Sequence, residues 1–508
     1  MKSSQPTLPL AAWIAPAAFV AIVLGAIAVR FWALDTQPGG LYPDEAAEGV
    51  SAQKLLTVPG YHPVFFDDDG GREALFAYIV ALAFRFFGSS ILVLRGTAAA
   101  VGVLGVLAIW LAARRFGRGA AIGAMAWSAG SLWLIAVSRD GFRNVITVGF
   151  GALALAAILR WGDRPSRSAA LLAGLSVGAG LWTYQPLKLT PLLVVAWLLW
   201  MRHSDRERYL RVRIHLVWAI LAYLAVAAPM IWTAITDANN FFGRGAGVSV
   251  FNPVSGSTDS YPVHVLKTLG MFLVTGDPNQ RHDVDALPLL GPVLFVLFAL
   301  GVWRAWRHRA DHGHALLLLG LVVYLIPPLV ANEGGAPHFL RSLGLAAVVA
   351  VLIGLGCGEV ARLAVRWSQP LGREAARAAG PAAVIAGAAV LAALGYLSVR
   401  AYLERPVNER YAAYSFADVQ LAAAAQGGPG TVVVVNDFDA LDVRFLDAHD
   451  PPATVAPGTR LTNPAVYSLI VATSRTDIAT ATDSATAARA SIVARDPQGH
   501  PVVWEVAP

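Results

Sequence analysis

Charged side chains are scarce in this sequence of 508 residues, of which 14% are charged and 56% are hydrophobic. Soluble proteins carry about 25% charged residues, so the composition excludes an ordinary soluble enzyme. Cysteine is nearly absent as well. Cys357 is the only one, which excludes an internal disulfide bond and redox chemistry at a cysteine pair. No basic stripe is interleaved with aromatic residues, so we expect no nucleic-acid partner.

The sequence consists largely of long apolar runs. A helix needs about 20 apolar residues to cross the hydrocarbon core of a bilayer. We interpret the first run as a membrane anchor, because it is long for a signal peptide and no clear cleavage signal follows it. About 11 transmembrane helices are predicted in total, over approximately residues 10–33, 91–113, 119–137, 143–160, 168–184, 187–201, 214–236, 286–306, 314–331, 339–362 and 380–402.

Arginine clusters between these runs predict the orientation of the chain. The positive-inside rule places short arginine-rich loops in the cytoplasm. With the N-terminus inside, this rule holds only if the short apolar stretch 74–87 does not cross, so we predict a juxtamembrane or half-inserted helix there. The clusters predicted to be cytoplasmic lie within residues 114–118, 160–167, 202–213, 304–309 and 362–377.

The same orientation places the remaining loops and the C-terminal tail on the non-cytoplasmic side. The long outer loops are 34–90 and 237–285, and we expect further juxtamembrane helices in them. After residue 402 the composition changes to short strand-like runs separated by polar segments. The sequence therefore predicts a polytopic α-helical membrane domain over residues 1–402 and a small extracytoplasmic α/β domain over residues 403–508. It also predicts a multi-pass protein of the cell membrane, in contact with its lipids.

Acidic residues open the first outer loop, where Pro43 is followed by Asp44 and Glu45, with Glu48 one turn later. Acids at a helix N-terminus are favoured by the helix dipole and by capping, which is one explanation for them. The alternative is catalytic: Asp44 would act as a general base on an acceptor, while Glu45 or Glu48 positions that acceptor.

Basic residues recur in the other outer loops. Arg72 follows a glycine pair and is placed either to grip a phosphate or to anchor the chain at the interface. Two arginines, Arg139 and Arg143, flank Asp140 in one outer turn, against the charge bias, and so require an anionic partner, either Asp140 or an anionic ligand. Together these side chains predict a pocket for a lipid-linked phosphate beside a carboxylate base, as glycosyl transfer requires. Its expected phosphate-binding residues are Arg72, Arg139, Arg143, Lys188, His338 and Arg341.

In these motifs the sequence resembles the GT-C integral-membrane glycosyltransferases of the protein O-mannosyltransferase and aminoarabinose transferase type, family 39. The resemblance covers most of the chain. It rests on five motifs in this order, namely Pro43-Asp44-Glu45, Gly71-Arg72-Glu73-Ala74-Leu75-Phe76, Phe86-Phe87-Gly88 with Leu94-Arg95, Ser138-Arg139, and Pro337-His338-Phe339-Leu340-Arg341.

This resemblance implies the roles of particular residues. It implies that Asp44 is the catalytic aspartate with Glu45 beside it, and that Arg72, Arg139 and Arg341 contact the donor phosphate. It also implies a gating or substrate role for the stretch 276–282, which contains Asp277, Arg281 and His282. One departure is Asn144, near which many relatives have an aspartate. The role of that second acid is therefore open for this chain.

The implied activity is the inverting transfer of a sugar from a polyprenyl-phosphate donor to an extracytoplasmic lipid, glycan or protein acceptor. The alternative is a secondary transporter or flippase for a lipid-linked or anionic solute, which would place charges at mid-membrane. A scaffold whose tail binds partners is a third interpretation. No cofactor is required by the sequence. A divalent cation is one use for the aspartates at 67–69, although a solvated acidic turn explains them as well.

Overall fold

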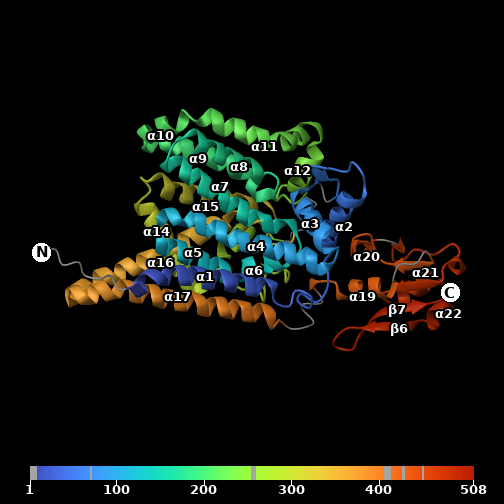
Figure 1. Ribbon diagram of the computed structural model, residues 1–508. Coiled ribbons are helices and arrows are strands. Elements are labelled where there is room, and N and C mark those ends of the chain that lie inside the picture. Colours follow the sequence, from blue (N-terminus) through green and yellow to red (C-terminus); the bar gives the residue numbers. More distant parts are fainter. Residues whose placement is uncertain (1–8, 69–70, 253–258, 406–412, 426–429, 449–450) are drawn as a thin grey trace.

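The computed structural model describes residues 9–68, 71–252, 259–405, 413–425, 430–448 and 451–508. Long helices lie side by side in one bundle, and the C-terminal sheet lies beyond one end of it (Figure 1). Asp69, one of the acidic residues singled out in the first outer loop, lies outside the described residues.

Each of the predicted apolar runs contains a helix. The helices of the bundle are α1 (Pro9–Phe31), α4 (Ile91–Ala113), α5 (Arg118–Gly130), α6 (Leu132–Arg139), α7 (Ile146–Asp163), α8 (Arg167–Gly180), α9 (Thr190–Ser204), α11 (Leu216–Thr236), α14 (Gly291–Arg307), α15 (His312–Val330), α16 (Ala346–Ser368) and α17 (Arg373–Leu403). Short 3-10 turns precede some of them, namely η2 (Arg143–Val145), η3 (Gln185–Leu189) and η4 (Leu343–Leu345).

Fewer helices than expected are long enough to cross a bilayer unaided. Within the described part of the chain, 6 helices are long and apolar enough, or 7 if the pair α5 and α6, bent by 55°, is counted as one span. Helices α8, α9 and α14 have 14, 15 and 17 residues. The membrane-spanning helical architecture is therefore confirmed, and the number of eleven crossings stays a prediction.

Helix α16 is the centre of the bundle, and every residue from Ala346 to Gly356 is buried. Glycines let its neighbour α14 approach closely. A Cβ atom at Gly356 would lie 1.9 Å from the carbonyl oxygen of Leu297, and one at Gly301 would lie 1.8 Å from that of Leu352. In a membrane the hydrophobic effect does not drive helices together, because lipid tails are as apolar as the helices. Close packing at small residues contributes to their association instead.

The first outer loop folds into two helices and a short ribbon. Helix α2 (Pro43–Thr57) packs on α3 (Leu75–Phe87), and between them β1 (Phe65–Phe66) pairs antiparallel with β2 (Arg72–Glu73). Helix α3 has 13 residues and is about 20 Å long, which is too short for the hydrocarbon core of about 30 Å. The structure thus agrees with the juxtamembrane helix predicted at 74–87. Helices α12 (Ala238–Gly247) and α13 (Tyr261–Gly270) form part of the second outer loop.

The C-terminal tail forms a five-stranded sheet in the order β4-β3-β5-β7-β6, with β4, β3 and β5 parallel and β7 and β6 antiparallel. Alternate strand residues feed two cores, one on each face of the sheet. The α/β prediction is confirmed, while the boundary at residue 403 stays a prediction. The strands are β3 (Thr431–Val434), β4 (Ala453–Val455), β5 (Leu469–Ala472), β6 (Ser491–Arg495) and β7 (Pro501–Val506). The helices are α19 (Phe416–Ala425), α20 (Ala440–Leu446), α21 (Arg475–Ala481) and α22 (Ser484–Ala488).

Helix α20 joins the tail to the bundle by packing against α2. Asp442 of α20 is fully buried there, and the charges that act on it come from Asp418, Glu45 and Asp439. Burial, reinforced by these acids, raises the pKa of Asp442 to about 10. The folded state therefore keeps a proton that the unfolded chain releases above about pH 4. The stability contributed by this group consequently falls as the pH rises between these values.

We predict that Asp442→Asn stabilises the protein at pH 8, because the neutral amide never has to hold a proton. A gain of about 1–3 kcal/mol is expected, because holding the proton costs about 1.4 kcal/mol per pH unit above about pH 4, while the buried amide still lacks hydrogen-bond partners. Thermal unfolding of the purified protein at pH 5 and pH 8 checks this, with the exposed Asp437→Asn as the control. An unchanged or lower midpoint at pH 8 would contradict the prediction.

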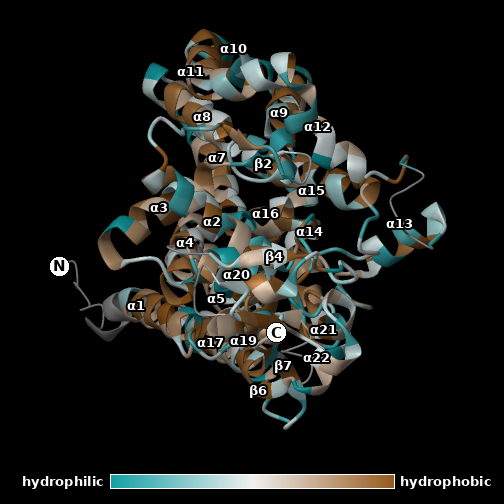
Figure 2. Cartoon of the chain, turned by 90° about the vertical axis from the view of Figure 1, so that its right-hand side faces the viewer, coloured by the Kyte–Doolittle hydropathy of each residue, from teal (hydrophilic) through white to brown (hydrophobic). Residues whose placement is uncertain are grey.

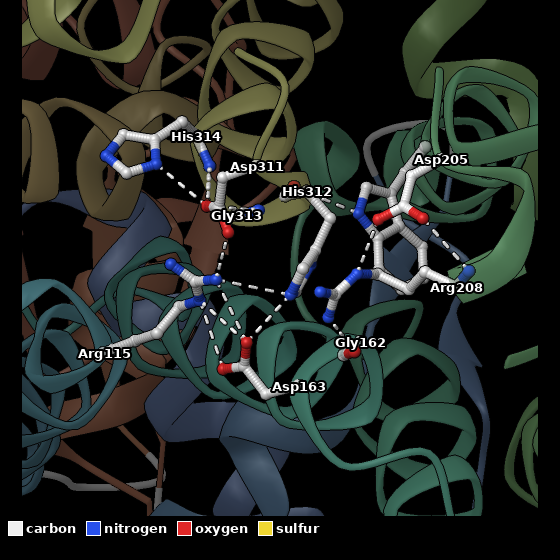
Figure 3. A network of polar contacts seen from close by, with 10 residues as sticks. Arg115, Gly162, Asp163, Asp205, Arg208, Asp311, His312, Gly313 and His314 are labelled. Atoms are coloured by element: carbon white, nitrogen blue, oxygen red, sulfur yellow. Dashed lines mark hydrogen bonds and ion pairs between the residues drawn. The ribbon is translucent and has the colours of Figure 1, made fainter. Parts of the chain in front are cut away.

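The end of the bundle opposite the tail holds its own polar network (Figure 3). Arg115 binds Asp163 at 3.0 Å and Asp311 at 2.7 Å, and His312 contacts Asp163 at 2.8 Å. Arg208 of α10 (Arg206–Arg213) donates to the carbonyl of Gly162. These contacts connect the helix ends near the arginines that are predicted to be cytoplasmic. Figure 1 shows α10 at this end and α2 and α3 at the other.

Candidate active site

Asp44 lies in the first turn of α2, where Pro43 begins the helix. Its side chain is 33% exposed, and one oxygen lies 3.7 Å from Nη1 of Arg281. Arg281 is held in place from the other side, because its guanidinium carbon lies 3.4 Å from the centre of the Tyr42 ring. Asp44 is therefore an accessible carboxylate with one loosely bound cation beside it.

Glu45 is adjacent in sequence but fully buried. Its two oxygens accept hydrogen bonds from Nε and Nη2 of Arg95 at 2.9 and 2.7 Å, from the amide of Gly141 at 2.7 Å and from the amide of Tyr42 at 3.2 Å. Burial raises the pKa of Glu45, but the charge and hydrogen bonds of Arg95 outweigh it and hold this pKa below its usual range. Glu45 thus fixes the start of α2 to α4 as a permanent anion. Its predicted part in catalysis stays a prediction that this geometry does not favour.

A buried chain of alternating charges runs beneath α2. Glu48 contacts Arg72 at 2.9 Å and Arg143 at 3.6 Å. Arg143 and Lys188 both contact Glu73, at 3.3 and 3.1 Å, and Arg72 also binds Asp68 at 2.8 Å. We call this set the buried charge chain; its members are Asp68, Arg72, Glu48, Arg143, Glu73 and Lys188, and Asp68, which is 49% exposed, is its outer end. Figure 2 views the molecule from this end and labels β2, which carries Arg72 and Glu73.

The buried charge chain has as many acids as bases and so needs no external ion for neutrality. Arg72 is 3% exposed, and beyond its two carboxylates it donates to the hydroxyl of Ser51 and lies over the ring of Phe66. Burial raises the pKa of Glu48, although Arg72 and Arg143 act in the opposite direction. The phosphate-binding roles of Arg72 and Arg143 remain predictions, and the geometry favours a scaffold beneath the site.

Arg139 lies elsewhere. It is fully buried and donates to the carbonyl oxygens of Val29 and Arg30 in the last turn of α1, and of Trp32 and Gln37 just after it. A guanidinium with five donors is well suited to these C-terminal carbonyls. The predicted contact of Arg139 with the donor phosphate has no support in this arrangement.

Asp140 follows directly and is also buried, with Oδ1 lacking a hydrogen-bond partner among the described residues. Burial and the carboxylate of Glu45 raise the pKa of Asp140 well above its usual range, against the pull of Arg281 and Arg95. Asp140 therefore takes up a proton more readily than an exposed aspartate does.

The loop before α14 brings Asp277 and His282 against His338, which precedes α16. Oδ2 of Asp277 lies 2.9 Å from Nδ1 of His282 and 3.9 Å from Nδ1 of His338. One ligand atom from each of the three residues lies within 4.8 Å of the others, so this group can hold a metal ion. Burial lowers the pKa of His338 well below its usual range, and Arg341 adds to the effect.

Arg341 contacts the carboxylate of Glu333 at 3.1 Å, and Arg244 of α12 contacts the same carboxylate at 3.1 Å. Glu333 is 44% exposed, so this group lies at the surface. Tyr184 connects it to the buried charge chain, because its ring lies 5.6 Å from the guanidinium carbon of Arg143 and its hydroxyl acts electrostatically on Arg341.

These contacts link the residues of separate outer loops into one neighbourhood. Asp44 contacts Arg281, whose neighbour His282 contacts Asp277, and Asp277 lies beside His338. Arg341 acts in turn on His338. Burial separates the basic residues into two groups. Arg72, Arg139 and Arg143 are at most 3% exposed, whereas the more accessible Arg341, Arg281, Lys188 and His338 are 7%, 10%, 12% and 13% exposed.

Glu73, Asp68 and Arg95 belong to this neighbourhood but are not among the site residues expected from the sequence. In the sequence, Glu73 is part of a motif and Asp68 part of an acidic turn. Arg95 lies inside an apolar run, and an arginine in a membrane helix requires a buried anion, which here is Glu45. That signal was available in the sequence. A cavity of about 310 Å³ lies apart from these residues, among α5, α14 and α17, and its lining is mainly apolar.

The chain is similar to known proteins in its fold and, in residues 73–232, in its sequence. Residues 73–232 match the family described as dolichyl-phosphate-mannose-protein mannosyltransferase. No curated protein matches the chain by sequence. Among solved structures, the chain is similar to ArnT from Cupriavidus metallidurans bound to undecaprenyl phosphate, with a TM-score of 0.63 and 16% identity over 96% of this chain and 97% of that one.

The apo state of the same ArnT gives a TM-score of 0.62 and 15% identity, covering 97% of this chain and 98% of that one. The apo oligosaccharyltransferase of Archaeoglobus fulgidus gives 0.57 and 14% identity, covering 94% and 72%. The chain thus has the fold of these membrane glycosyltransferases, as its resemblance to the GT-C type predicted, and residues 73–232 are similar to the dolichyl-phosphate-mannose-protein mannosyltransferase family.

Proposed function

We propose that the protein transfers a sugar from a polyprenyl-phosphate donor to an acceptor outside the cytoplasm, with Asp44 as the general base. One observation carries this proposal. In the acidic first turns of α2, Glu45 and Glu48 are buried and bound to arginines, whereas Asp44 is 33% exposed and has, among the described residues, a single ion pair of 3.7 Å. A general base must reach the proton that it removes, so exposure and weak pairing suit Asp44.

The proposed reaction is one displacement at the anomeric carbon. Asp44 takes the proton from the acceptor hydroxyl or amine, the acceptor forms the new glycosidic bond, and the bond to the phosphate oxygen breaks. The polyprenyl phosphate leaves with the bonding electrons. Because the acceptor attacks opposite the leaving group, the configuration of the anomeric carbon inverts.

The leaving phosphate needs basic side chains whose hydrogen-bond donors remain accessible to a ligand. Arg281, Lys188 and His338 are partly exposed basic side chains of the neighbourhood, and Arg341 is buried but pairs with Glu333, which is 44% exposed. Preorganised cations at the point where charge develops contribute the largest share of catalysis in reactions of this kind. ArnT was solved with undecaprenyl phosphate bound, which supports a lipid phosphate as the ligand.

The proposal places the site at the extracytoplasmic face, because the arginine-rich loops lie at the opposite end of the bundle. It leaves the sugar and the acceptor open among lipids, glycans and proteins. A transporter would place ionisable residues near the middle of its spans, whereas the residues proposed for this site belong to helix ends and outer loops.

The direct test of the proposed function is a transfer assay. The full chain, reconstituted in sealed proteoliposomes, would be incubated with a panel of labelled polyprenyl-phosphate sugars and with a membrane extract from its source as acceptor. Label is expected to move from one of these donors to a new product, with release of polyprenyl phosphate. A donor that flips across the bilayer without losing its sugar would favour the transporter instead.

We predict that Arg281→Ala raises the KM for the donor about 10- to 100-fold, because a contact with a charged group contributes about 1.5–3 kcal/mol. Initial rates at varied donor concentration measure this effect. Arg211→Ala, an exposed arginine of α10 at the opposite end, is the control. A KM unchanged in Arg281→Ala would remove this residue from the proposed donor site.

A further inference from the structure

A buried carboxylate and two imidazoles meet where two separate outer segments touch. Asp277 and His282 belong to the loop between α13 and α14, while His338 comes more than 50 residues later. Asp277 and His282 are each 1% exposed. The His282 and His338 rings have their centres 5.2 Å apart, and the three candidate ligand atoms lie within 4.8 Å of one another. A metal ion bonded to nitrogen and oxygen at about 2.0–2.2 Å brings its ligand atoms to within such distances.

Protein groups do not fully satisfy these side chains. Nε2 of His282 and Nδ1 of His338 have no hydrogen-bond partner among the described residues. Leaving a buried polar atom without a partner costs about 1–3 kcal/mol, so such an atom requires an explanation. An imidazole nitrogen that lacks a donor can give its lone pair to a metal ion.

The carboxylate between the rings is already fixed in place. Oδ1 of Asp277 accepts the amide hydrogen of Asn279 at 2.8 Å, and Oδ2 accepts that of Phe339 at 2.7 Å. These outer hydrogen bonds resemble those that orient the ligands of protein metal sites. They also show that Asp277 joins the two outer segments even before an ion is considered.

We infer that Asp277, His282 and His338 form a binding site for a divalent transition-metal ion, with Zn²⁺ as the best match. Imidazole nitrogens favour zinc and its neighbours in the first transition row, whereas Ca²⁺ and Mg²⁺ prefer sites made of oxygen ligands only. Three protein ligands leave at least one further position on the ion.

The site would fix the loop that carries Arg281. This residue precedes His282 directly and contacts Asp44, while Arg341 lies three residues after His338. An ion that crosslinks the two segments would hold both arginines at the end of the bundle where Asp44 lies. This consequence for transfer rests on the proposed function, whereas metal binding itself does not.

Metal binding by the full chain can be measured without any donor or acceptor. The purified protein would be stripped with a chelator, and its titration with Zn²⁺ followed by calorimetry and by metal analysis after desalting. One ion per chain is expected. His282→Ala and His338→Gln are each expected to weaken binding by more than about 100-fold, since changes in outer groups alone cost 10- to 100-fold. His500→Gln, an exposed histidine of the C-terminal domain, is the control.

Asp277→Asn is a less suitable test of metal binding, because Asp277 also accepts backbone hydrogen bonds. The histidine variants therefore provide the test. Each variant would first be compared with the wild type by thermal unfolding in the chelator, so that only folded protein is titrated. Co²⁺ in place of Zn²⁺ gives visible absorption bands that report ligation by the imidazoles. The inference would be overturned if the wild type did not bind one ion per chain. It would also be overturned if both folded histidine variants bound Zn²⁺ as tightly as the wild type does. A chain that binds zinc but transfers no sugar would refute the proposed function alone.

Discussion

Replacing Asp44 with asparagine is expected to lower the rate of sugar transfer by about 100- to 10,000-fold, the contribution of a positioned general base. The amide has nearly the same shape as the carboxylate but cannot accept the proton of the acceptor. Because Asp44 is 33% exposed and its one ion pair is long, the fold should be retained. Single-turnover transfer by the purified variant measures the loss, and thermal unfolding measures the fold.

Donor binding separates this account from a purely structural role. Asp44→Asn should bind the donor about as well as the wild type does, because the cations around the phosphate are unchanged. Asp35→Asn is the matched control, since Asp35 is an exposed acid of the same outer loop. Transfer by Asp44→Asn at a rate close to that of the wild type would remove the proposed base.

Glu73→Gln is expected to destabilise the protein severely, by about 3–5 kcal/mol, the typical cost of breaking a buried ion pair from one side. Glu73 is fully buried and pairs with both Arg143 and Lys188. The neutral amide leaves two cations without their common anion. Unfolding midpoints of the purified variant, together with its yield from membranes, measure the effect.

An exposed ion pair provides the contrast. Glu207→Gln removes the partner of Arg211 on α10, where Glu207 is 85% exposed, and pairs of this kind contribute little. Its midpoint should equal that of the wild type within error. If Glu73→Gln unfolded at the same temperature as Glu207→Gln, the buried charge chain would not be the scaffold described above.

The architecture could be predicted from the sequence because the bilayer imposes it. Apolar runs gave the helices, and charge bias gave the short helix α3, which has 13 residues in the structure. The strand-like runs at 431–435, 467–471 and 501–506 correspond to β3, β5 and β7. Strands β4 and β6 were not recognised, because they are short or largely exposed and lack the apolar pattern.

The gathering of the outer charges could also be predicted, but their pairing could not. From the sequence, Arg72 is expected either to grip a phosphate or to anchor the chain, and Arg139 to bind either Asp140 or an anionic ligand. In the structure, Arg72 is bound by Glu48 and Asp68, and Arg139 by carbonyl oxygens at the end of α1. Composition counts charges but does not show which of them face each other. Partners that lie far apart in the chain, such as Glu73 and Lys188, follow only from the packing of α7 and η3 on the outer loop.

This pairing suggests that some charged side chains stabilise the fold while others are accessible to a ligand. The buried charge chain and the pair of Glu45 with Arg95 hold α2, β2 and α4 together, and they need no ligand to do so. The more accessible side chains outside these two groups are Asp44, Arg281 and His338. Rigid, neutralised surroundings keep catalytic groups in position more accurately than mobile loops would.

The stereochemistry of transfer tests the central claim most directly. The purified protein would be given a polyprenyl-phosphate sugar of known anomeric configuration, and the product and the released lipid would be identified by NMR and mass spectrometry. The account predicts a product of inverted configuration together with polyprenyl monophosphate. A product that keeps the configuration of the donor, with the same lipid released, would contradict a single displacement assisted by Asp44.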